Sequence, residues 1–73
     1  MKYIYAVTVQ PISYTWEKLS QECYLTLRGA QNFIESRSDK PVKYDDFRYQ
    51  GTTNVYRIYE LQVKEWLQWI EKK

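Results

Sequence analysis

The chain begins with residues of high strand propensity. Between Tyr3 and Ile12 they occupy both sets of alternating positions, so both faces of an extended segment would be largely apolar. This pattern predicts a strand in the interior of a sheet. Pro11 has no amide hydrogen to donate, and it marks either the fraying end of this strand or an edge position.

Further along the chain, the spacing of the apolar residues changes from the two-residue period of a strand to the period of a helix. Residues 13–21 fit either a long hairpin connection or a short helical turn, whereas residues 22–26 predict a second strand. Thr26 is suited to cap the N-terminus of a helix, and Lys40, which precedes Pro41, is expected to lie beyond the end of that helix. The apolar positions of the helix share one face. They are Leu27, Ala30, Phe33 and Ile34.

A hairpin and a second helix are predicted in the last third of the chain. Phe47 and Tyr49 alternate before the turn-rich sequence QGTTN, and alternation resumes from Val55 to Val63. Within that second segment, Tyr56 and Ile58 point to one face. The tail then takes a helical period. Its apolar arc consists of Val63, Trp66, Leu67, Trp69 and Ile70.

These elements predict one α+β domain over residues 1–73. In the order β-β-α-β-β-α, a small antiparallel sheet of about four strands carries the first helix on one face. The short C-terminal amphipathic helix would not be stable alone in water, so we expect it to dock. It could cover the other face, an edge of the sheet, or a partner.

Composition restricts how this small domain can be stabilised. The chain has 73 residues, one cysteine (Cys23) and no histidine. A disulfide within the chain is therefore excluded, and a Cys/His metal site is not expected. Aromatic packing and self-association remain as sources of stability, because 18% of the residues are aromatic. A homodimer, or a self-assembling virion component, therefore stays open.

Catalytic chemistry has few candidate groups in this sequence. Histidine, the commonest general acid–base residue, is absent, and Cys23 has no histidine to activate it. Asp45 and Asp46 are adjacent, so on a strand their carboxylates would point to opposite faces unless a turn lies there. Gly29 and Gly51 stand alone and make no phosphate-binding loop. We therefore expect a non-enzymatic protein without a cofactor or a metal.

Three segments carry a resemblance to a known class of proteins. The segments KYIYAVTV, CYLTLRGAQNFIESRSDKP and DDFRYQGTTNVYRIYELQVKE together cover about two thirds of the chain. They are similar to small phage and prophage proteins of Gram-positive bacteria, which share a strand, a strand running into a capped helix, and a closing hairpin. The residues of this sequence that match the shared arrangement are Thr26, Ala30, Phe33, Ile34 and the strand Tyr56–Val63. The resemblance implies the fold and a phage setting, with no catalytic residue to transfer.

Two classes of binding function remain. Interface hot spots favour Trp, Tyr and Arg, so the first hypothesis is a protein-binding module. In the phage setting it would inhibit a host protein or defence system, as an anti-CRISPR protein does. Its candidate residues are Tyr14, Trp16, Asp45, Asp46, Arg48, Trp66, Trp69 and Ile70.

The alternative is an accessory nucleic-acid-binding protein with bases stacked on a Tyr/Arg sheet face. Its candidate residues are Arg48, Tyr49, Tyr56 and Arg57. A net charge of +2, from eleven basic and nine acidic residues, is small for such a function and favours the protein-binding hypothesis.

The location of the protein is also predicted from the sequence. No apolar run approaches the length of a membrane-spanning helix, so the membrane is not an expected partner. Met1 and Lys2 lead directly into the alternating segment and not into an apolar signal sequence. We therefore expect a cytoplasmic protein, which in the phage setting means the host cytoplasm.

Overall fold

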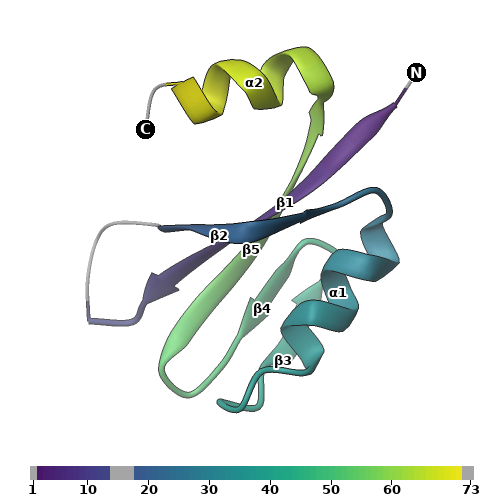
Figure 1. Cartoon of the computed structure of the whole chain (residues 1–73). Helices are drawn as coiled ribbons and strands as arrows, with labels where there is room; N and C mark the ends of the chain where they lie inside the picture. Colours follow the sequence, from purple (N-terminus) through teal and green to yellow (C-terminus); the bar gives the residue numbers. More distant parts are fainter. Residues whose placement is uncertain (1, 14–17, 72–73) are drawn as a thin grey trace.

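The computed structural model describes residues 2–13 and 18–71, and for residues 18–22, 66 and 69–71 it describes the backbone alone. An antiparallel sheet and two helices make up this part of the chain (Figure 1). In chain order the elements are β1 (Tyr3–Pro11), β2 (Lys18–Tyr24), α1 (Leu27–Glu35), β3 (Val42–Asp45), β4 (Arg48–Gln50), β5 (Asn54–Gln62) and α2 (Val63–Glu71).

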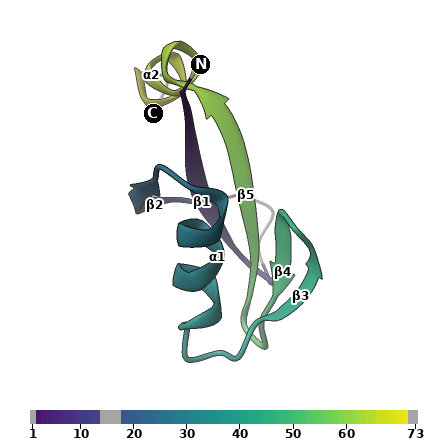
Figure 2. The same cartoon turned by 90° about the vertical axis from the view of Figure 1, so that its right-hand side faces the viewer.

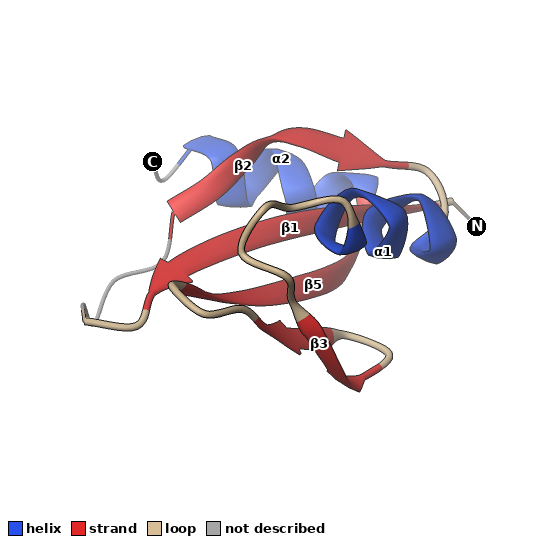
Figure 3. Ribbon diagram, turned by 90° about the horizontal axis from the view of Figure 1, so that it is seen from below, coloured by secondary structure: helices blue, strands red, loops and turns tan. Residues whose placement is uncertain are grey.

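The described sheet has five strands in the order β2-β1-β5-β4-β3, with every neighbouring pair antiparallel. The α+β class is confirmed. The expectation of about four strands in the order β-β-α-β-β-α is wrong, because β3 precedes the β4–β5 hairpin as a further strand. Figure 3 shows β3 at one side of the sheet and β2 at the other.

A tight turn separates β3 from β4. The Asp45 carboxylate accepts a hydrogen bond from the Phe47 backbone amide at 2.8 Å and one from the Arg48 side chain at 2.8 Å. Aspartate favours turns because its side chain can bond to the backbone two residues further on. The sequence VKYDDFRYQ therefore folds back on itself, whereas the alternation alone predicted one strand leading into the hairpin.

β1 and β5 form the centre of the sheet. Their pairing runs without interruption from Tyr3 opposite Gln62 to Pro11 opposite Asn54. The predicted interior position of the first strand is confirmed, and the strand ends at Pro11. The second strand was predicted at residues 22–26, but β2 begins at Lys18 and ends at Tyr24.

The core lies between α1 and one face of the sheet (Figure 2). Ala30 and Ile34 of α1 are fully buried, as are Val7 of β1 and Tyr56 of β5. Tyr49 of β4 is 1% exposed. Leu27 and Phe33 pack against this cluster, so the predicted apolar face of the helix is confirmed. The predicted cap is also present: the Thr26 hydroxyl accepts a hydrogen bond from the Gly29 amide at 3.0 Å.

α2 lies at the end of the sheet where β5 finishes and β1 begins (Figures 1 and 2). The predicted C-terminal helix is confirmed, and it contacts β5 and β1. Val63 and Leu67, both on the predicted apolar arc, are 42% and 51% exposed. Among the described residues, no helix is long and apolar enough to span a membrane.

Candidate functional site

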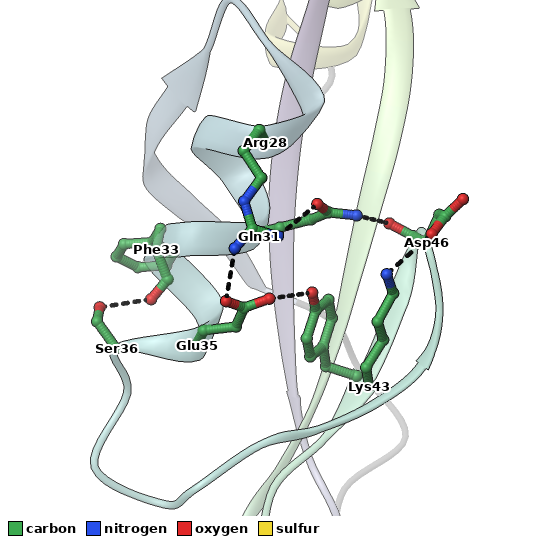
Figure 4. A network of polar contacts seen from close by, with 8 residues as sticks. Arg28, Gln31, Phe33, Glu35, Ser36, Lys43 and Asp46 are labelled. Atoms are coloured by element: carbon green, nitrogen blue, oxygen red, sulfur yellow. Dashed lines mark hydrogen bonds and ion pairs between the residues drawn. The ribbon is translucent and has the colours of Figure 1, made fainter.

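The β3–β4 hairpin is fixed to α1 from one side (Figure 4). Gln31 is 5% exposed and donates a hydrogen bond from Nε2 to the Asp46 backbone carbonyl at 3.0 Å. Glu35 accepts a 2.7 Å hydrogen bond from the Tyr49 hydroxyl. Burial and this bond to Glu35 together raise the pKa of Tyr49 to about 12. Because α1 holds the hairpin at these two points, the position of the hairpin relative to the sheet is well defined.

The strand register separates the two faces of the hairpin. Tyr49 pairs with Tyr56, and both point into the core beneath α1. The neighbouring pair, Arg48 and Arg57, therefore lies on the opposite face, since side chains alternate along a strand. Val42 belongs to this same outward face, because it pairs with Gln50, two residues from Arg48.

Large apolar side chains are exposed on this part of the molecule. Tyr44 is 75% exposed, Val42 is 71% exposed, and Phe47 in the turn is 38% exposed. Three exposed large apolar side chains within six residues of the chain make this segment a candidate interaction site. We use the name hairpin surface for Val42, Tyr44, Phe47, Arg48 and Arg57.

Arg48 is held in a fixed orientation within the hairpin surface. Its Nε and Nη2 atoms both bond to Asp45 Oδ2, at 2.8 and 2.6 Å. Its guanidinium carbon lies 4.7 Å from the centre of the Tyr44 ring, a cation–π geometry. The bond from Arg48 holds the pKa of Asp45 below its usual value, and the same bond raises the pKa of Arg48. Both groups therefore stay charged over the physiological pH range.

A shallow, open hollow of about 490 Å³ lies beside Arg48. The residues that line it come from β3, β4, β5 and the turn between β3 and β4, and they include two arginines and several apolar side chains. They are Asp45, Phe47, Arg48, Arg57, Ile58 and Tyr59. Its walls therefore combine apolar side chains with two guanidinium groups and one carboxylate.

Three of the predicted protein-binding residues come together in this hairpin: Asp45, Asp46 and Arg48. The two carboxylates bond to different groups, since Asp45 holds Arg48 whereas Asp46 lies 3.0 Å from Lys43 Nζ. They do not form a shared carboxylate pair.

The other predicted protein-binding residues lie elsewhere in the chain. Tyr14 and Trp16 lie outside the described residues, as do the side chains of Trp66, Trp69 and Ile70. The role of these residues stays a prediction.

The predicted Tyr/Arg face for nucleic acid is not present as one face. Tyr49 and Tyr56 are 1% and 0% exposed, so their rings are not accessible to bases. Arg48 and Arg57 are exposed on the opposite face. The four residues were grouped by composition, but each tyrosine is adjacent to one of the arginines in sequence. On a strand, adjacent side chains point to opposite sides.

Several residues of this region were missed by the sequence analysis. Val42 and Tyr44 were not expected to be exposed on an edge strand, since β3 itself was not predicted. The doubled aspartate after Tyr44 is a turn signal that could have indicated both the turn and the exposure. Gln31 was also missed, although it lies four residues after Leu27 and hence on the buried face of the helix.

The described residues show no group that points to metal chemistry. Among them, no three Cys, His, Asp or Glu side chains lie close enough together to hold a metal ion. Cys23, in β2, is a free thiol of intermediate burial.

Comparison with known proteins gives no family for this chain. No protein-family model matches it, and searches of curated proteins and of solved structures found no match.

Proposed function

We propose that this protein is a non-catalytic binding domain that contacts another protein through its hairpin surface. The observation that carries the proposal is the exposure of Tyr44 and Val42 beside an arginine held in place by Asp45. Tyr and Arg are the residue types that contribute most often to binding hot spots. A partner that covers an exposed apolar side chain stabilises the complex, by roughly 1.5–3 kcal/mol for each side chain that becomes fully buried.

The way the hairpin is held supports this proposal. Binding costs less when the contact residues are already ordered, because less side-chain and loop freedom is lost. Gln31 and Glu35 hold the hairpin from the α1 side, and Asp45 closes its turn. Arg48 then needs little rearrangement to meet a partner.

We further propose a class of partner, on the basis of the resemblance to phage and prophage proteins. In this setting the partner is a host protein or a host defence complex, and the domain inhibits it by occupying a surface, as anti-CRISPR proteins do. The mechanism requires no turnover. The C-terminal residues Trp66, Trp69 and Ile70, together with Tyr14 and Trp16, are proposed as a second contact.

The proposal is tested by affinity capture with surface variants. The immobilised parent chain and the variants Tyr44→Ser and Val42→Ser are incubated with a lysate of a Gram-positive host. Leu25→Ser serves as the matched control, because Leu25 is 80% exposed but belongs to the β2–α1 connection. We expect Tyr44→Ser and Val42→Ser to lose a protein that the parent and the control retain.

Folding of each variant is checked by its thermal unfolding midpoint. Substitutions at exposed positions change stability little, so all three variants should unfold near the parent temperature. If the folded Tyr44→Ser and Val42→Ser variants retain every protein that the parent captures, the hairpin surface is not the binding site.

A further inference from the structure

We draw no further inference here: the strongest candidate, the surface patch that the exposed side chains of Val63 and Leu67 form on α2 at the end of the sheet, carries nothing because nothing in the described part of the chain shows what covers it.

Discussion

Asp39 joins the loop after α1 to the turn between β4 and β5. Its Oδ1 accepts a 2.7 Å hydrogen bond from the Tyr56 hydroxyl, and its Oδ2 accepts a 3.2 Å bond from the Thr53 hydroxyl. Burial alone would raise the pKa of Asp39, but the bonds from Tyr56 and Thr53 outweigh burial and lower it. A Cβ atom at Gly51 would overlap this carboxylate, so the packing here is close.

The variant Asp39→Asn should lower the free energy of unfolding by about 1 kcal/mol at neutral pH, because charged hydrogen bonds become neutral ones. The pKa of Asp39 is depressed in the folded state. The Asp39 carboxylate therefore contributes its full stabilisation at a pH above the pKa of an aspartate in the unfolded chain, which is near 4. The contribution is lost as the pH falls through the folded-state pKa. The parent should therefore lose more stability than Asp39→Asn below about pH 4.

Urea unfolding at pH 7, 4 and 2.5 measures this difference. Asp46→Asn is the control, since Asp46 makes an exposed ion pair with Lys43 and such pairs contribute little. Identical acid dependence for the parent and Asp39→Asn would contradict the assigned role of Asp39.

Tyr49 gives the corresponding prediction at alkaline pH. Its pKa in the folded state is about 12, whereas an unfolded tyrosine ionises near pH 10. Stability is therefore full below about pH 10 and is lost as the pH rises toward 12. Tyr49→Phe should cost about 1 kcal/mol at neutral pH and should lose less stability than the parent above about pH 10.

Unfolding by urea at pH 7, 10 and 11.5 tests this expectation, with Tyr44→Phe as the control at an exposed position. Two observations would count against the part-buried bond to Glu35. One is an unchanged neutral stability for Tyr49→Phe, and the other is an alkaline loss equal to that of the parent.

At the scale of elements, α1 shows how far local signals predict structure. Its N-cap, its apolar face and its end before Pro41 are all present as expected. These features depend on residues within one or two turns of each other, so the sequence contains them directly. The long strands β1 and β5 were predicted for a similar reason, β1 from a run of residues with high strand propensity and β5 from alternation along the chain.

The elements that were missed or displaced depend on distant contacts. β3 has four residues, and its strand conformation is defined by pairing with β4. β2 begins four residues before the predicted strand, where it pairs with β1. The candidate site was only partly predictable for the same reason. Asp45, Asp46 and Arg48 were identified from composition, but the exposure of Val42 and Tyr44 follows from the position of β3 at the edge.

The helix cap gives a prediction at the element scale. Thr26→Ala should lower the free energy of unfolding by about 1 kcal/mol, because the Gly29 amide loses its acceptor. Thr26→Ser keeps the hydroxyl and should restore most of that loss. The measurement is urea unfolding of the three proteins side by side. Equal stability of the alanine and serine variants would show that the hydroxyl does not cap α1.

At the scale of the whole molecule, the described aromatic residues include some in the core and others that are exposed. Tyr49 and Tyr56 are part of the core, and Tyr44 and Phe47 are exposed on the hairpin surface. A chain of 73 residues has a small core, and three of its exposed large apolar side chains lie within the six residues from Val42 to Phe47. This division is the basis of the proposed function.

Site-specific photo-crosslinking tests that claim most directly. A photoreactive phenylalanine analogue replaces Tyr44 in one variant and Asn32 on the exposed side of α1 in another, and both are produced in Gram-positive cells. After irradiation, we predict a discrete adduct with one cellular protein from position 44 and none from position 32. The absence of an adduct at position 44, or the same adducts from both positions, would contradict the hairpin surface as the binding site.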